Sequence, residues 1–256
     1  MSLEMARMAS ADGISTIACT PHILPGVYNN SGPAIRRAVA QLTESIAEAG
    51  IPISLVTGAD VHIAPDLVVQ LRDGRALTLK DSRYLLLEPP HHVVPPRLED
   101  LIFGLQAAGY FPILTHPERL SWLEGHYDLI RRLASCSVLM QITAGSVMGR
   151  FGRRPRYWAE RMLDEGLCHL LATDAHNTEQ RAPRMADARD FVAQRLGEDE
   201  AINLVLRRPH GILNNLSPAE LPPLPQTRSR QEVSGAEVPT LWRNILRRAR
   251  RMAGAE

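Results

Sequence analysis

Short apolar runs recur along the chain, and between them lie longer stretches in which apolar residues return about every 3.6 positions. The short runs predict β-strands, and the longer stretches predict amphipathic α-helices. Strands that alternate with helices are typical of βα units, in which helices cover a parallel sheet or barrel. The strands predicted in this way span residues 14–19, 53–57, 84–87, 112–115, 138–143 and 168–173.

The predicted helices complete an α/β fold class. Several of them end at a glycine, which suits the left-handed residue that closes many helices. A helix comes first in the chain, before any strand. The predicted helices span residues 3–11, 33–49, 97–108, 127–134 and 156–165, with a helical pair over 182–207.

The domain is expected to end near residue 220. Residues 221–238 are rich in proline and then polar, which is typical of a linker. Residues 239–256 place apolar side chains on one helical face and arginines largely on the other. Such a basic tail helix is suited to an anionic membrane surface or a partner, although a plain solvated tail has the same composition.

Charge and cysteine content narrow the class of protein. Seven Arg and three Glu follow residue 225, so residues 1–225, with 22 basic and 25 acidic residues, carry a formal charge of −3. A body of this charge argues against a nucleic-acid-binding surface. No apolar run approaches the roughly 20 residues of a membrane span, and residues 1–7 do not have the pattern of a signal peptide. The three cysteines lie in apolar stretches and predict a reduced, cytoplasmic protein.

Five of the six predicted strands are followed closely by a side chain that can bind a metal ion. The carboxyl ends of parallel strands meet at one mouth, so these side chains are expected to converge there. Imidazole and carboxylate ligands without thiolate favour Mn, Fe or Zn, and the number of ligands favours more than one ion. The predicted ligands are His22, Asp60, Glu88, His116, Asp174 and His176. The last two, spaced as Asp-x-His, are expected to point to the same side of an extended strand end.

Arginines near the same strand ends suggest a phosphate ester as substrate. Arg119 and Arg181 follow the predicted ligands by a few residues, and a guanidinium can bind two phosphate oxygens and stabilise the charge of a transition state. Arg150 and Arg153, after the fifth predicted strand, would extend this basic edge, although arginines on a solvated surface have the same appearance.

Seven short motifs follow one another between residues 3 and 215. They are Thr20-Pro21-His22, Gly58-Ala59-Asp60-Val61, residues 81–88, His116-Pro117-Glu118-Arg119, residues 141–146, Phe151-Gly152 and residues 174–178. In this order they resemble the bacterial tyrosine phosphatases of the polymerase-and-histidinol-phosphatase (PHP) superfamily, which are encoded with capsular and exopolysaccharide synthesis genes.

The resemblance implies a distorted, TIM-like barrel of about seven βα units with a site for two or three metal ions, preferring Mn. It implies phosphotyrosine hydrolysis on a protein such as the tyrosine kinase that controls polysaccharide export. By the same resemblance His22, Glu88, His116, Asp174 and His176 would be metal ligands, and Arg119 would bind phosphate. Asp60 stands where many relatives carry Glu.

Relatives also open with a strand bearing Asp-x-His-x-His, and no such segment precedes the helix predicted at residues 3–11. We therefore expect either a start upstream of Met1 or an incomplete metal site. Three hypotheses follow: a metal-dependent tyrosine phosphatase, a small-molecule phosphatase acting on an ester such as histidinol phosphate, or a protein that binds phosphotyrosine or a kinase without turnover. The oligomeric state is left open.

Overall fold

The computed structural model describes residues 1–225 and shows two parallel sheets. The larger sheet has six strands in the order β2-β4-β5-β6-β7-β8, and the smaller one pairs β1 with β3. Every pairing between these strands is parallel, as the βα pattern predicts. The strands are β1 (Thr16–Cys19), β2 (His22–Ile23), β3 (Ser54–Thr57), β4 (Asp60–His62), β5 (Tyr84–Glu88), β6 (Phe111–Thr115), β7 (Leu139–Thr143) and β8 (Leu170–Ala172).

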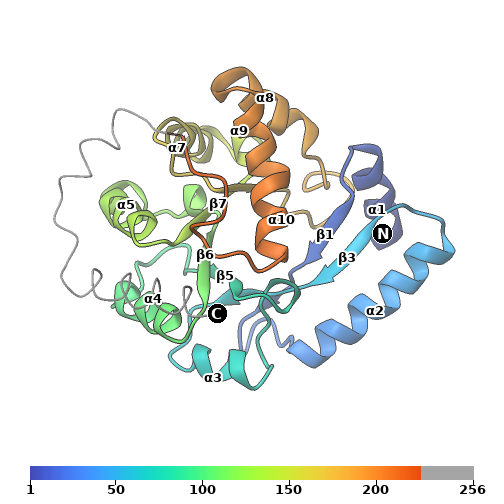
Figure 1. The fold of residues 1–256 in the computed structure, drawn as a ribbon, viewed down its shortest axis with the longest axis horizontal. Helices are drawn as coiled ribbons and strands as arrows, with labels where there is room; N and C mark the ends of the chain where they lie inside the picture. The colour runs from blue at the N-terminus through green and yellow to red at the C-terminus, as the bar shows by residue number, and fades with distance from the viewer. Residues whose placement is uncertain (226–256) are drawn as a thin grey trace.

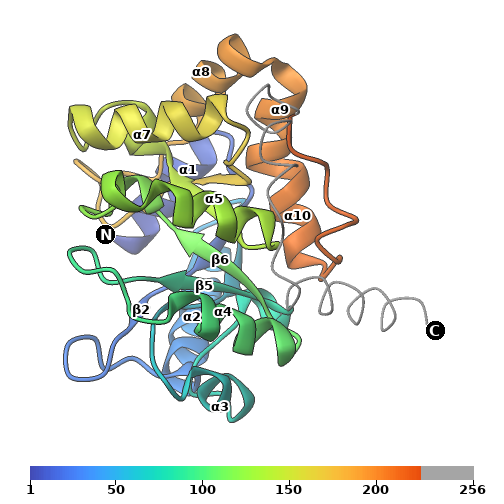
Figure 2. The ribbon, with the colours of Figure 1, turned by 90° about the vertical axis from the view of Figure 1, so that its left-hand side faces the viewer.

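Helices cover the strands from several sides (Figure 1). In the view of Figure 2, α5 and α7 lie on one side of β5 and β6, and α3 and α4 lie on the other. The helices are α1 (Ser2–Ala11), α2 (Gly32–Glu48), α3 (Leu67–Arg72), α4 (Leu98–Ala107), α5 (Tyr127–Ser135), α6 (Ala144–Val147), α7 (Arg153–Asp164), α8 (Ala186–Leu196), α9 (Glu198–Ile202) and α10 (Arg208–Leu213). A short π-helical segment, Asn203–Arg207, joins α9 to α10.

Strand β5 shows why its sequence is a continuous apolar run. Successive side chains of a strand point to opposite faces. Leu85 and Leu87 pack into the main core, whereas Tyr84 and Leu86 pack into a second core with Ile212 of α10. Both faces of the sheet are therefore buried here, as is usual for parallel sheets.

Two chain segments run from the smaller sheet into the larger one, and in each segment two residues separate the two strands. Thr20 and Pro21 separate β1 from β2, and Gly58 and Ala59 separate β3 from β4, while the pairing register continues unchanged across both breaks. Gly58 fits closely at its position, because a Cβ there would lie 2.8 Å from Leu79 Cδ2 and the leucine side chain would have to shift. The short strands β2 and β4 follow these breaks, and each begins with a predicted ligand, His22 in β2 and Asp60 in β4.

All six predicted strands are present, with ends that differ by up to two residues. The elements that the pattern did not predict are short: β2, β4, α3, α6 and α10. The coarse α/β class is thus confirmed, and the distorted PHP barrel of seven βα units stays a prediction.

The predicted linker starts at residue 221, but residues 221–225 pack on the domain. Leu221 and Leu224 are buried, and the Arg208 guanidinium donates hydrogen bonds to the carbonyl oxygens of Pro222 and Pro223. The rest of the predicted linker and the predicted tail helix at 239–256 lie outside the described residues. Within residues 1–225, no helix combines the length and apolar character needed to cross a membrane.

Candidate metal centre

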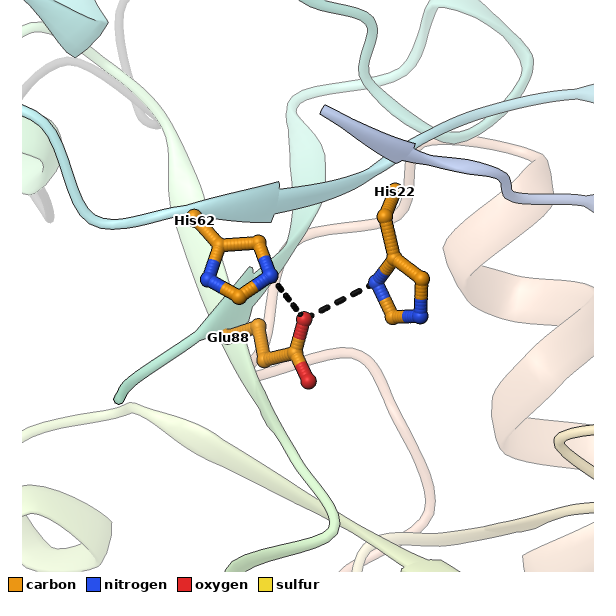
Figure 3. A group of neighbouring side chains, drawn as sticks. All are labelled: His22, His62 and Glu88. Carbon is orange, nitrogen blue, oxygen red and sulfur yellow. Dashed lines mark ion pairs between the residues drawn. The ribbon is translucent and has the colours of Figure 1, made fainter. Parts of the chain in front are cut away.

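Glu88, the last residue of β5, lies at the centre of a group of four histidines. Its Oε2 is 2.9 Å from His22 Nδ1 and 2.5 Å from His62 Nε2, so the two rings flank the carboxylate (Figure 3). Its Oε1 is 3.2 Å from His91 Nε2 and 3.3 Å from His116 Nε2. Each carboxylate oxygen therefore faces its own pair of imidazoles.

These donors form two groups with the spacing of a metal site. In the first group, His22, His62 and Glu88 offer ligand atoms within 4.8 Å of one another, and in the second, His91 and His116 do so with Glu88. Among the described residues, His22 Nδ1 and Glu88 Oε2 are buried without a hydrogen-bond partner, despite their short separation. Buried polar atoms seldom lack partners. Imidazole and carboxylate donors arranged in this way fit divalent ions such as Mn, Fe or Zn.

The contacts around Glu88 shift the protonation of several groups. Burial alone would raise the pKa of Glu88, but contacts with the four histidines together outweigh burial and lower that pKa well below its usual range. The contact with Glu88 raises the pKa of His22. Burial would lower the pKa of His116, yet Glu88 and the charge of Asp60 raise it. A metal ion that binds these imidazoles would compete with protons for the same nitrogen atoms.

Asp60 lies beside this cluster and is buried. Its Oδ2 is 3.7 Å from His22 Nδ1 and 3.9 Å from His116 Nε2, and its Oδ1 accepts a hydrogen bond from Thr115 Oγ1 at 3.3 Å. Burial, with a smaller effect from the charge of Glu88, raises the pKa of Asp60 to about 6. Asp60 belongs to neither donor group, so its role as a ligand stays a prediction.

Asp174 binds two arginines. Its Oδ2 accepts a hydrogen bond from Arg119 Nη1 at 2.6 Å and another from Arg181 Nη2. The ring of Phe151 lies beneath both guanidinium groups, with its centroid 4.6 Å from Arg119 Cζ and 6.0 Å from Arg181 Cζ. Two cations that sequence places 62 positions apart are thus held together at one side of the site.

The backbone at Asp174 differs from the prediction. Asp174 has a φ of +48°, in the left-handed region, so the extended strand end predicted for Asp174 and His176 is wrong. His176 Nδ1 lies 3.8 Å from Asp174 Oδ1, and its ring centroid is 6.1 Å from that of His22. Both residues line the cavity, but neither is in the two donor groups found among the described residues.

A buried carboxylate fixes the loop that carries His116 and Arg119. Glu118 Oε1 accepts hydrogen bonds from the Thr143 backbone N–H at 3.0 Å and from Ser146 Oγ at 2.7 Å. The loop is therefore held by hydrogen bonds to the end of β7 and to α6. His116 itself has a φ of +36°, which turns the chain sharply at the end of β6.

These groups surround a cavity of about 330 Å³. Arg150 and Arg153 are exposed and do not contribute to its lining within the described chain, and Arg150 Nη2 is instead 3.9 Å from Asp187 Oδ2. The cavity is lined by His22, Tyr28, His62, Glu88, His91, His116, Arg119, Asp174, His176 and Arg181.

The sequence reasoning missed His62, His91 and Tyr28. A signal for His62 was available, because Asp60-Val61-His62 has the same Asp-x-His spacing as residues 174–176. His91 lies three residues after Glu88, in a loop where periodicity carries no information.

The chain is similar in sequence to a described family and to named proteins. Residues 1–214 match the profile of a family described as "Capsular polysaccharide synthesis, CpsB/CapC". Tyrosine-protein phosphatase YwqE of Bacillus subtilis is 33% identical over 227 residues, covering 89% of each chain. Tyrosine-protein phosphatase CpsB of Streptococcus pneumoniae is 27% identical over 206 residues, covering 78% of this chain and 85% of that one.

A solved structure is also similar, with a TM-score of 0.81 and 33% identity over 88% of this chain and 91% of the other. It comes from work on YwqE from Bacillus subtilis and CpsB from Streptococcus pneumoniae, described there as metal-dependent tyrosine phosphatases.

Proposed function

The chain belongs to the CpsB/CapC family of capsular polysaccharide synthesis proteins, and from this we propose that it is a metal-dependent protein-tyrosine phosphatase. The observation that carries the proposal is the pairing, in one cavity, of the Glu88 cluster with the arginines at Asp174. A phosphate monoester needs both a cationic receptor for its oxygens and a means of activating water.

The residues that would hold metal ions are Glu88 with His22 and His62 in one group, and Glu88 with His91 and His116 in the other. When bound, divalent ions supply Lewis-acid activation of water and neutralise phosphate charge. We propose Mn as the preferred ion. Asp174 and His176 line the same cavity. They would complete a larger ligand set if the Asp174 carboxylate exchanged a hydrogen bond from an arginine for contact with a metal ion.

Arg119 and Arg181 would bind the phosphate oxygens. Their guanidinium groups are oriented by Asp174 and by the ring of Phe151, which limits the freedom lost on binding. Arg181 Nε is buried and has no hydrogen-bond partner among residues 1–225, so an anionic oxygen nearby would satisfy it. A guanidinium group that binds two phosphate oxygens also stabilises the charge that develops during phosphoryl transfer.

The substrate that we propose is a phosphotyrosyl protein, such as a tyrosine kinase of polysaccharide export. The relatives are named tyrosine phosphatases, and the family is described by capsular polysaccharide synthesis. Contact of the tail with a membrane, and the Asp-x-His-x-His segment implied by the resemblance, stay predictions.

The test is turnover by the purified full chain. With Mn present we expect release of phosphate from a phosphotyrosyl peptide, and loss of that release with a chelator. Hydrolysis of histidinol phosphate far faster than the peptide would instead support the small-molecule alternative. Metal binding without any turnover would support the binding-only alternative.

A matched pair of variants tests the arginine role. Arg119→Met removes a cavity guanidinium and is expected to raise KM for the peptide strongly. Arg37→Met removes an exposed arginine of α2 that is not part of the described cavity lining. Equal effects of the two substitutions would contradict the assignment of Arg119.

A further inference from the structure

Tyr28 is an exposed aromatic residue at the mouth of the cavity. Its side chain is 47% exposed although it lines the same cavity as the Glu88 cluster. Its ring stacks on that of His22, with centroids 5.1 Å apart and an angle of 30° between the planes. One face of the ring is therefore directed at the metal-site histidine, and a large part of the side chain remains open to solvent.

The loop that carries Tyr28 is closed by its own hydrogen bonds. The Tyr28 N–H donates to the Leu24 carbonyl oxygen at 2.7 Å, and the Leu24 N–H donates back to the Tyr28 carbonyl oxygen at 3.1 Å. Asn29 Oδ1 accepts from the Gly26 N–H at 2.9 Å, and Gly26 has a φ of +84° that favours glycine. Asn30 Nδ2 also donates to the His22 carbonyl oxygen at 2.8 Å. The loop thus presents the ring in a defined position before any ligand arrives.

The loop contributes apolar side chains to the rim of the cavity, whereas the interior of the cavity is charged. In Figure 2 the loop after β2 projects to the same side as the loops after β5 and β8. Val27, next to Tyr28, is 65% exposed, whereas the interior of the cavity holds the carboxylate, the imidazoles and the two arginines. An ester with a phosphate at one end and a flat apolar ring at the other matches this division.

We propose that Tyr28 selects aromatic phosphate esters, its ring packing against the phenyl ring of a phosphotyrosyl side chain whose phosphate lies among Arg119, Arg181 and the Glu88 cluster. The proposal rests on the proposed phosphatase function and adds the residue that sets its substrate class. Stacked or edge-to-face aromatic pairs contribute beyond the burial of apolar area. A phosphoserine side chain has no ring and gains nothing from this contact.

The test compares the binding of two ligands that share one headgroup. Phenylphosphonate and methylphosphonate are titrated into the Mn-loaded full chain by calorimetry, and the ratio of their dissociation constants measures the preference for a ring. We expect wild type to prefer phenylphosphonate, Tyr28→Ala to reduce that preference about 10-fold, and Tyr28→Phe to retain it. Tyr157→Ala is the matched control, because Tyr157 is 57% exposed on α7 and is not in the described cavity lining.

A preference for the ring that survives in Tyr28→Ala would overturn the role of Tyr28. If both affinities were also unchanged, Tyr28 would not contribute to binding, and if both were weakened equally, Tyr28 would act through His22 alone. Since the titration needs no turnover, its result is separate from that of the phosphatase assay: an inactive chain that still shows the Tyr28-dependent preference would contradict the proposed function and leave this inference standing.

Discussion

Phe151 supports both cavity arginines, and its replacement tests whether their orientation matters. The ring lies beneath Arg119 and Arg181, at 4.6 and 6.0 Å from their Cζ atoms. Residue 145 leaves room for the ring only because it is glycine, since a Cβ there would lie 2.8 Å from Phe151 Cε2. Phe151→Leu keeps an apolar side chain in this space but removes the π face.

The expected loss follows from the two cation–π contacts. Each contributes about 0.5–1 kcal/mol at a partly exposed site, so the pair contributes about 1–2 kcal/mol. Because 1.4 kcal/mol corresponds to a factor of ten, kcat/KM for a phosphotyrosyl peptide is expected to fall by about 5- to 30-fold. Phe151 does not itself reach the substrate in this scheme. The loss should therefore appear together with weaker inhibition by inorganic phosphate.

Steady-state kinetics with the Mn-loaded chain provides the measurement. Phe111→Leu is the matched control, because the Phe111 ring lies 4.7 Å from Arg83 Cζ and neither residue is in the described cavity lining. Phe151→Trp, if it folds, should keep phosphate inhibition close to that of wild type. A change below about twofold in Phe151→Leu, or an equal loss in Phe111→Leu, would refute the reasoning.

Three further predictions address metal, pH and stability. Glu88→Gln should weaken Mn binding at least about 100-fold in a chelator competition, because replacing even the residues that support metal ligands lowers metal affinity about 10- to 100-fold. Glu124→Gln, at an exposed position, should leave Mn binding unchanged. With a pKa of about 6 for Asp60, protonation as pH falls from 7.5 to 5.5 should weaken Mn binding about 4-fold from this group alone, and pH-independent binding would contradict this. Arg208→Met leaves the buried carboxylate of Glu200 unpaired and should destabilise the fold by about 3–5 kcal/mol in urea unfolding; a loss below about 1 kcal/mol would contradict it.

The parts of the fold that sequence predicts are those with a long pattern. Strand β5 reads as a strand because both of its faces are buried, and α2 reads as a helix over most of its length. The short strands β2 and β4 have two and three residues, so no alternation develops within them. Pro21 and Gly58 interrupt the segments that lead into them, and their pairing depends on partners distant in sequence.

The site is predictable in outline for a similar reason. Residues directly after strands can be found from the strands themselves, and His22, Glu88 and His116 do meet in the cluster. His91 follows two prolines in a loop, and only the folded chain places its Nε2 3.2 Å from Glu88 Oε1. Phe151 lies in a segment whose relation to Arg119 and Arg181 depends on the tertiary structure.

The two Asp-x-His segments show what a spacing rule leaves undetermined. In strand β4, Asp60 and His62 are two residues apart and therefore lie on the same face of the strand. Both side chains reach the Glu88 cluster, where His62 contacts the carboxylate directly. At Asp174 the left-handed backbone ends the extended conformation, and the carboxylate binds two arginines. The same two residue types at the same spacing thus acquire different partners. The backbone conformation at the first residue, extended at Asp60 and left-handed at Asp174, distinguishes the two segments.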